Sequence, residues 1–529
     1  MSTLVGLDFG TSNTVIALWN GFEGETLYLP DYGRFYAPDP NFTATPSIPS
    51  LIHYEPNRQW IGNQVLQRNL YESPRTFRWM KRYIAQRSPR TLQVEGRAIS
   101  AAEAGRDFLL AVLTALRVER NLASDAQLAC CTPVEAFEHY ENWLLETVQA
   151  AGFERIRLID EPSAAALGYG ITLHPNDVYM VFDFGGGTLD VAILLVEEAH
   201  TAAQGQRCRV LGKAGTELGG ATIDGWLYQA VLQRNQRSEH DEHIRAISRL
   251  LLTECERVKE QLSFRERVTL SVMHPRTGEV LEAEFTRAEF EALLDEHGAY
   301  TQIHRTIQRA LTDAYERGYP ETSIRAVLMV GGSSLIPSVQ QTVQRLFGRE
   351  RVYLQRPLEA VARGAAAFIA GVDFYDYIQH DYAIRHRNMH TGEYEYLTIV
   401  PRGTPYPTRE PVRRLVIKAT HTGQTRMGID IFELGDVSRS PAAAVELVFD
   451  PAGAARVLPV DHEQLRERRL FWMNEHAPTF LTAEPPAQRG EPCFEVAFSV
   501  DANKRLVITA RDLRTMRLVL ENHPVVRLE

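Results

Sequence analysis

The chain has 529 residues, of which 44% are hydrophobic and 23% are charged, and its formal net charge is −10. This length suggests about three domains, and the composition is that of a globular protein with a sizeable core. The acidic balance argues against broad attraction to nucleic acid or to anionic lipid. No apolar run approaches a membrane span, and the N-terminus has no signal-peptide pattern. We therefore expect a cytoplasmic location, no nucleic-acid partner and no membrane partner.

Two segments far apart in the chain share one pattern. In residues 5–19 and 181–195, a short apolar run ends at an aspartate, Asp8 or Asp183, and Phe-Gly follows before a second apolar run begins. Apolar β-branched runs indicate strands, and the glycines indicate a tight turn. Each copy therefore predicts a β-hairpin with an acid at its tip.

The residues at these tips suit a phosphate and a metal ion. Glycine leaves room for backbone N–H groups to approach an anion, and Thr11, Ser12 and Thr188 add hydroxyl donors. The aspartates would repel phosphate alone, but they fit Mg²⁺, which keeps several waters and binds through one or two carboxylates. Two such tips across a cleft predict a clamp around a magnesium triphosphate. For one copy alone, an ordinary glycine-containing hairpin is an equally good interpretation.

Other phosphate-binding patterns are missing from the sequence. Asp-Phe-Gly occurs without the His-Arg-Asp and Ala-Pro-Glu segments of a protein kinase. The chain also lacks a P-loop and a Gly-x-Gly-x-x-Gly motif after a strand.

Glycines and hydroxyls also follow a predicted strand near residue 330. Residues 326–347 predict a strand, a turn at Gly331–Gly332, and a helix with Pro337 in its first turn. A nucleotide can approach such a surface closely, although a simple strand-to-helix turn is the better interpretation of the segment when it is taken alone.

Two alanine-rich helices are predicted at residues 161–170 and 360–371. Their small side chains would let the two helices pack closely and cross at a hinge, whereas plain core packing is the better interpretation of the alanines themselves. Asp160 and Glu161 stand at the end of the strand that leads into the first helix, from which Glu161 would reach into a cleft.

Together these segments resemble the heat shock protein 70 family, within the actin-like ATPase superfamily. The resemblance runs from residue 4 to about residue 371. The motifs that carry it are Asp8-Phe-Gly-Thr-Ser, Thr45-Pro-Ser, Lys81-Arg82, Thr132-Pro-Val, Glu161-Pro-Ser-Ala-Ala, Asp183-Phe-Gly-Gly-Gly-Thr-Leu-Asp190, Leu218-Gly-Gly, Cys255-Glu-Arg-Val-Lys259 and Val330-Gly-Gly-Ser-Ser.

The resemblance implies an α/β fold class and a division of the chain into parts. An actin-like nucleotide-binding body of two duplicated ribonuclease-H-like lobes would span 1–373, with a connector at 374–396. A mostly β domain that resembles the chaperone peptide-binding domain would span 397–529, with an insertion at 436–480 and a helix pattern at 461–476. Period-2 runs support strands in this region. Since the sequence stops at Glu529, we expect no helical lid.

The resemblance also implies a site. The catalytic residues would be Asp8, Lys81, Glu161, Asp183 and Asp190, with Asp8 and Asp183 holding Mg²⁺ through water. The phosphate contacts would be Gly10, Thr11, Ser12, Asn13, Gly185, Gly186, Gly187 and Thr188. The contacts to the sugar and base would be Gly219, Gly220, Glu256, Lys259, Ser263, Gly331, Gly332 and Ser333.

Two positions depart from the family pattern at the base. Where the family has two arginines that sandwich adenine, this chain has Glu260 and Leu335. A guanidinium stacks on a planar ring and a carboxylate does not. Triphosphate chemistry is therefore expected to be intact, while the preference for adenine is less secure.

The implied function is a slow ATPase of the chaperone type, with ATP/ADP and Mg²⁺ as cofactors. It would couple its nucleotide state to binding of a polypeptide client, with a co-chaperone or nucleotide exchange factor as a further partner. The alternative is a nucleotide-sensing adaptor with little turnover and one dedicated protein partner, which the altered base site and the lack of a leucine-rich linker favour. A small-molecule kinase of the same superfamily ranks third, since it has no use for a C-terminal β-domain.

Overall fold

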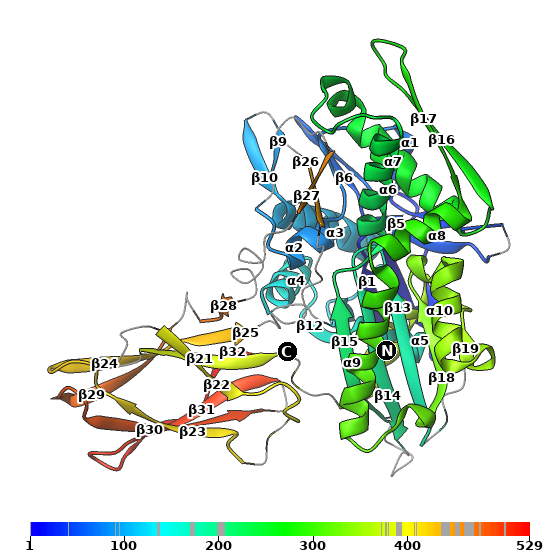
Figure 1. Cartoon of the computed structure of the whole chain (residues 1–529). Helices are drawn as coiled ribbons and strands as arrows, with labels where there is room; N and C mark the ends of the chain where they lie inside the picture. The colour runs from blue at the N-terminus through cyan, green and yellow to red at the C-terminus, as the bar shows by residue number, and fades with distance from the viewer. Residues whose placement is uncertain are drawn as a thin grey trace. The chain divides into compact units, whose positions relative to one another are not determined.

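A computed structural model describes residues 2–528 apart from 41, 90, 95, 135–137, 170–173, 175, 198–206, 372, 376–377, 379, 388–393, 407, 409, 435–444, 450–454, 460–469, 475–477 and 502–503 (Figure 1). The chain forms two compact units. The N-terminal unit comprises Met1–Phe374 with Pro441–Val460, and the C-terminal unit comprises Tyr375–Ser440 with Asp461–Glu529.

The first half of the N-terminal unit is built on a mixed sheet with the strand order β12-β11-β1-β2-β5-β4, where β3 also pairs with β2. β1 runs antiparallel to β2 and parallel to β11. Phe108 of the long helix α3 packs on Phe9 of β1, with 5.9 Å between the ring centroids. The bounds are β1 (Leu4–Phe9), β2 (Asn13–Trp19), β3 (Gly24–Thr26), β4 (Arg34–Tyr36), β5 (Thr45–Pro49), β11 (Gln127–Thr132), β12 (Arg155–Asp160) and α3 (Ala101–Glu119).

The second half repeats this plan. Its sheet has the order β19-β18-β13-β14-β15-β20, and β13 runs antiparallel to β14 and parallel to β18. Figure 1 shows helix α9 alongside β14 and β15. The two predicted acid-tipped hairpins are thus confirmed as β1–β2 and β13–β14, and so is the α/β fold class. The bounds are β13 (Val178–Phe184), β14 (Leu189–Glu197), β15 (Arg207–Thr216), β18 (Ile324–Val330), β19 (Val352–Tyr353), β20 (Asp373–Tyr375) and α9 (Ala299–Glu316).

Two alanine-rich helices, α5 (Glu161–Gly168) and α11 (Ala360–Ile369), cross in close contact, as predicted. A Cβ atom on Gly364 would overlap the carbonyl oxygen of Ala164. This approach leaves room only for glycine at the crossing. Because α5 contacts β13 and β14 while α11 contacts β1 and β2, the crossing ties the two halves together.

The remaining elements of the N-terminal unit flank the two sheets. The hairpin β26–β27, from the region expected to be an insertion, also belongs to this unit and lies beside α6 and α7. None of the described helices is long and apolar enough to cross a membrane. The bounds are α1 (Asn63–Gln67), α2 (Met80–Ala85), α4 (Glu138–Ala150), α6 (Gly220–Arg234), α7 (Glu242–Leu262), α8 (Arg287–Glu296), α10 (Pro337–Phe347), β6 (Ile52–Glu55), β7 (Arg58–Ile61), β8 (Thr76–Phe77), β9 (Thr91–Val94), β10 (Arg97–Ser100), β16 (Arg267–Met273), β17 (Val280–Thr286), β26 (Val445–Phe449) and β27 (Ala455–Pro459).

The C-terminal unit consists of β-strands around one apolar core. Its sheets have the orders β22-β21-β25-β28, β23-β30-β31-β32 and β24-β29, and buried side chains such as Phe494 and Phe498 fill the space between strands. The bounds are β21 (Asp381–Arg387), β22 (Tyr394–Val400), β23 (Arg413–Lys418), β24 (Gln424–Ile429), β25 (Ile431–Leu434), β28 (Leu470–Trp472), β29 (Thr479–Ala487), β30 (Pro492–Val500), β31 (Arg505–Asp512) and β32 (Leu518–Arg527).

Two parts of this region differ in detail from the expectations. The stretch 374–396, expected to be a connector, contains β21, which pairs with both β22 and β25. The helix predicted over 461–476 is wrong for residues 470–472, which form strand β28 and pair with β25. Trp472 of β28 stacks on Phe432 of β25, with 5.8 Å between the ring centroids. Residues 461–469 lie outside the described residues.

Candidate active site

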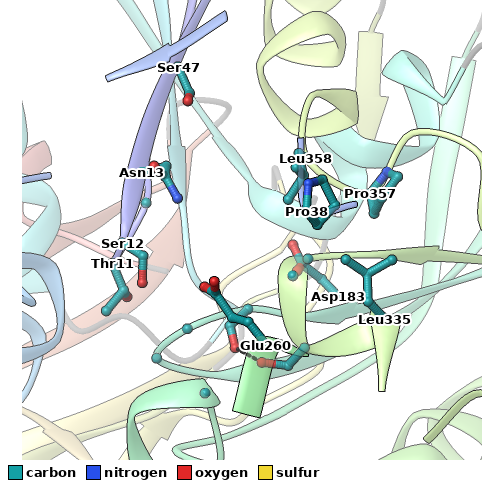
Figure 2. A pocket seen from close by; sticks show the side chains of 18 of the residues that line it. Thr11, Ser12, Asn13, Pro38, Ser47, Asp183, Glu260, Leu335, Pro357 and Leu358 are labelled. Atoms are coloured by element: carbon teal, nitrogen blue, oxygen red, sulfur yellow. Dashed lines mark hydrogen bonds between the residues drawn. The ribbon is translucent and has the colours of Figure 1, made fainter. Parts of the chain in front are cut away.

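A cavity in the N-terminal unit is lined by the tips of both hairpins and by segments that follow β18 and end α7. Figure 2 shows residues from each tip around this space, among them Thr11, Ser12, Asn13 and Asp183, with Glu260 and Leu335. The predicted residues that line it are Asp8, Gly10, Thr11, Ser12, Asn13, Lys81, Glu161, Asp183, Gly185, Gly186, Gly187, Thr188, Gly220, Glu256, Lys259, Ser263, Gly331, Gly332 and Ser333.

The two hairpin tips touch each other at one end of the cavity. A Cβ atom added to Gly187 would lie 2.6 Å from Oγ1 of Thr11, and one added to Gly186 would lie 2.8 Å from Oγ of Ser12. Side chains at these glycines would fill the space between the tips. Backbone N–H groups and hydroxyls therefore meet there, as a phosphate chain requires.

Two carboxylates stand beside this cradle. Asp8 lies on β1 and Asp183 on β13, and both line the cavity. Burial, opposed by Lys81 and reinforced by Glu161, raises the pKa of Asp8 to about 7. Burial and the neighbouring carboxylates of Glu161 and Asp190 raise the pKa of Asp183 well above its usual range. The site therefore holds more negative charge than it can neutralise alone.

A buried lysine offsets part of this charge. Lys81, on α2, donates to the carboxylate of Glu161, the first residue of α5. Burial by itself would lower the pKa of the Lys81 ammonium, but the carboxylates of Glu161 and Asp8 and the Tyr140 hydroxyl raise it. Lys81 therefore stays charged at the edge of the cavity, next to a carboxylate that can accept a proton or orient a water.

Polar contacts also organise the opposite wall of the cavity. Lys259 of α7 lies 2.8 Å from Oδ1 of Asp224 and donates to the Gly220 carbonyl at 3.2 Å. The hydroxyl of Ser333 donates to the Gly185 carbonyl at 2.9 Å. These contacts tie α6, α7 and the turn after β18 to the second hairpin tip, so hydroxyl and ammonium donors face the same space.

The far end of the cavity is apolar and acidic. Phe264, Leu335 and Tyr36 line it together with Glu260, whose carboxylate accepts a hydrogen bond from the Tyr36 hydroxyl. Glu260 is exposed to solvent. Its pKa is nevertheless raised, first by desolvation from the surrounding protein and second by repulsion from the Glu256 carboxylate. The lining residues include no arginine. This end can hold a planar ring by apolar contact but offers it no stacked cation.

Two predicted site residues do not line the cavity. Gly219 lies behind the second tip, where a Cβ atom would overlap the backbone of Gly187. Asp190 is buried, and its Oδ1 accepts from the backbone N–H of Val134 at 3.2 Å. These two residues support the tip rather than face a ligand.

Several residues near the site were missed by the sequence analysis. Asp224 holds Lys259, Tyr140 lies beside Lys81, and Lys213 pairs with Asp160. Only Asp160 had a signal, since it precedes Glu161 at the end of a predicted strand. The others lie on helices or strands whose sequence pattern indicates ordinary buried positions.

The donor set fits a magnesium triphosphate. Gly186 and Gly187 add no side chain of their own where they face the hydroxyls of Ser12 and Thr11, and two carboxylates with raised pKa values stand beside them. Hard oxygen ligands of this kind are those that Mg²⁺ prefers. A bound cation would keep both carboxylates ionised and would offset their mutual repulsion.

Comparisons with known proteins show which proteins this chain is similar to. Residues 118–381 match the family model described as Hsp70 protein. The chain is 28% identical to a "Chaperone protein dnaK" of Emiliania huxleyi over 97% of this chain and 78% of that relative. It is also 28% identical to "Chaperone protein dnaK3" of Synechococcus elongatus, over 98% of this chain and 65% of that relative. A "Chaperone protein dnaK" of Cyanidioschyzon merolae is 28% identical over 97% of this chain and 80% of its own length.

Proposed function

Because this chain belongs to the heat shock protein 70 family, we propose that it binds and hydrolyses ATP and couples its nucleotide state to the binding of a polypeptide by its C-terminal β-domain. The observation that carries the proposal is the contact between two acid-tipped hairpins beside the Lys81–Glu161 pair. Such an arrangement binds a triphosphate and holds charged groups at the phosphate that is transferred.

Each residue has a distinct role in this proposal. The backbone N–H groups of Gly186 and Gly187, with Thr11 and Thr188, bind the phosphates, whereas the N–H of Gly185 donates to the Thr188 carbonyl at 3.0 Å and closes the turn. Asp8 and Asp183 would hold Mg²⁺ through water, and the ion would neutralise charge on the phosphates. Glu161 orients the attacking water and accepts its proton at the carboxylate, while Lys81 stabilises the charge that develops on the phosphoryl oxygens.

The β-domain would bind its client as an extended polypeptide, because strands and their edges offer backbone hydrogen bonds to an extended chain. The remaining partners in this proposal are a co-chaperone or a nucleotide exchange factor.

A second candidate function is a nucleotide-sensing adaptor that turns over little ATP and binds one dedicated protein. The specific observation in its favour is the base end of the cavity, where Glu260 and Leu335 provide no stacked cation. Weaker contact with the base would leave nucleotide occupancy sensitive to concentration.

Steady-state hydrolysis with and without unfolded peptides separates these functions. For the chaperone-type ATPase, we expect unfolded peptides to stimulate ATP turnover and Asp183→Ala to abolish that turnover. Unchanged turnover in that variant would refute the site. Tight nucleotide binding without peptide stimulation, with a single stoichiometric partner, would favour the adaptor, and ADP release that depends on an added sugar would indicate a small-molecule kinase.

A further inference from the structure

Lys213 forms a further buried lysine–carboxylate pair in the N-terminal unit, besides Lys81–Glu161 and Lys259–Asp224. Its Nζ lies 2.6 Å from Oδ2 of Asp160, and the two side chains are 2% and 13% exposed. Neither residue lines the cavity, and the function proposed above uses neither. Burying two charges contributes little net stability, because desolvation offsets their attraction. A role in fixing geometry explains the pair better than a role in stability.

The pair connects the two halves of the N-terminal unit. Lys213 lies on β15 in the second sheet, whereas Asp160 ends β12 in the first sheet. On β15, Lys213 is opposite Ala192 of β14, and Asp190, two residues earlier on β14, is opposite Asp183 of β13. Residues that are opposite, or two apart along a strand, share a face. Lys213 therefore shares a sheet face with the two aspartates of the second hairpin.

The other oxygen of Asp160 leads directly to Glu161. Oδ1 of Asp160 accepts from the backbone N–H of Ser163 at 2.8 Å and so caps the N-terminus of α5. Glu161 is the first residue of that helix and accepts from Lys81. The Asp160 carboxylate thus accepts from the Lys213 ammonium on Oδ2 and from the backbone N–H of Ser163 on Oδ1.

We propose that Lys213 is a positioning residue, which acts through Asp160 to fix the first turn of α5 and so to place the Glu161 carboxylate for hydrolysis. The proposal rests on the ATPase function given above. With Lys213 in place, the ion pair holds Asp160 in the one orientation that also caps the helix. Without Lys213, the carboxylate is free to turn toward solvent and the cap is weakened.

Nucleotide binding has less need of this pair. The phosphate cradle is formed by the contact between Thr11 and Gly187, and the Val134 N–H to Asp190 bond provides a second link between the two halves. Loss of Lys213 is therefore expected to slow the chemical step while leaving nucleotide affinity nearly unchanged.

The test compares Lys213→Met, which keeps the length of the side chain, with Lys213→Arg, which keeps its charge. Arg209→Met is the matched control, because Arg209 also lies on β15 and pairs with Glu197 of β14 at 3.0 Å in a partly exposed position. In Lys213→Met we expect hydrogen exchange at the Ser163 amide to be about tenfold faster and single-turnover hydrolysis to be about tenfold slower. Lys213→Arg should restore most of both values, and Arg209→Met should alter neither.

Two outcomes would overturn the inference. One is exchange at Ser163 that stays at the wild-type rate in Lys213→Met, and the other is faster exchange with an unchanged rate of hydrolysis. If Lys213→Met does not fold, the double variant Asp160→Ala/Lys213→Met removes both buried charges and the cap, and a wild-type hydrolysis rate in it would equally overturn the inference. A wild-type protein without ATP turnover would instead refute the proposed function.

Discussion

Lys81 and Glu161, which are 80 positions apart in the chain, form a buried ion pair between α2 and the first residue of α5. The two side chains are 7% and 9% exposed. In such a place each charge depends on the other, since an unpaired buried charge is strongly unfavourable. The pair also lines the cavity in which the two hairpin tips meet.

We therefore expect Lys81→Met to slow single-turnover ATP hydrolysis by about 100-fold, with an ATP dissociation constant within about threefold of the wild-type value. The methionine keeps the apolar stem but removes the cation that would stabilise charge on the phosphoryl oxygens. Rapid-quench measurement of the first turnover, beside equilibrium titration of a fluorescent nucleotide, gives both quantities. A variant that lost affinity but kept its turnover rate would contradict the role given to Lys81.

Cation binding is expected to depend on pH near neutrality. Burial, with Lys81 opposing it, raises the pKa of Asp8 from 3.8 to about 7 in the ligand-free protein. Below that pH a proton occupies the carboxylate, so Mg²⁺ must displace it. The Mg²⁺ concentration needed for half-maximal nucleotide binding should therefore rise as pH falls below 7, by up to about tenfold per unit for one proton released.

Titration with Mg²⁺ at pH 8.0 and pH 6.0 measures this effect, and the choice of these two values brackets the pKa of Asp8. Asp8→Asn should weaken Mg²⁺ binding at both pH values, and it should reduce the difference between the affinities measured at the two pH values. An affinity for Mg²⁺ that is the same at both pH values in the wild-type protein would show that Asp8 is already ionised.

The hairpins and the crossed helices could be predicted because their signals are local. An aspartate at the end of an apolar run, followed by glycines, specifies the tips at Asp8 and Asp183, and two alanine-rich segments specify the crossing at Gly364. The strands of the C-terminal unit, such as β31, follow from their alternating pattern.

Pairings between distant elements could not be predicted. Lys213 and Asp160 are 53 positions apart, and neither has a neighbour in sequence that specifies the other. Their contact depends on how two sheets pack against one crossing of helices, and this is not encoded in any local run. The pairing of β21 with β25 could not be predicted either, because the polar and aromatic sequence of β21 resembles a connector.

The base end of the cavity allows a gain-of-function prediction. Replacing Glu260 by arginine puts a planar cation beside Leu335 and Phe264 and removes a carboxylate that accepts a hydrogen bond from the Tyr36 hydroxyl. Stacking of a cation on a ring contributes about 0.5–2 kcal/mol, so we expect Glu260→Arg to bind ATP about twofold to thirtyfold more tightly.

Equilibrium titrations with ATP and with inorganic triphosphate distinguish contact with the base from general attraction. Tighter binding should appear for ATP and be small for triphosphate. Glu296→Arg, on α8, makes the same change in charge outside the lining residues and serves as the control. An equal gain for both ligands would assign the effect to long-range electrostatics.

Hydrogen bonds that join residues 71–73 to helix α7 are expected to control nucleotide release. The hydroxyl of Tyr71 donates to Oε2 of Glu256 on α7 at 2.5 Å, and Arg249 donates to the Ser73 carbonyl at 2.6 Å. A hydrogen bond to a charged group contributes about 1.5–3 kcal/mol, and opening the cleft must break this one. Tyr71→Phe should therefore release bound nucleotide about tenfold faster, as stopped-flow displacement of a fluorescent ADP would measure.

Tyr54 provides a matched control for this prediction. Its hydroxyl donates to Oδ2 of Asp107 at 2.9 Å, and both residues lie in the first half of the unit. Tyr54→Phe removes the same kind of bond without touching the second half, so the release rate should stay at the wild-type value. If both variants released nucleotide equally fast, general loosening of the first half would explain the effect, and the Tyr71–Glu256 bond would have no special part in holding the cleft closed.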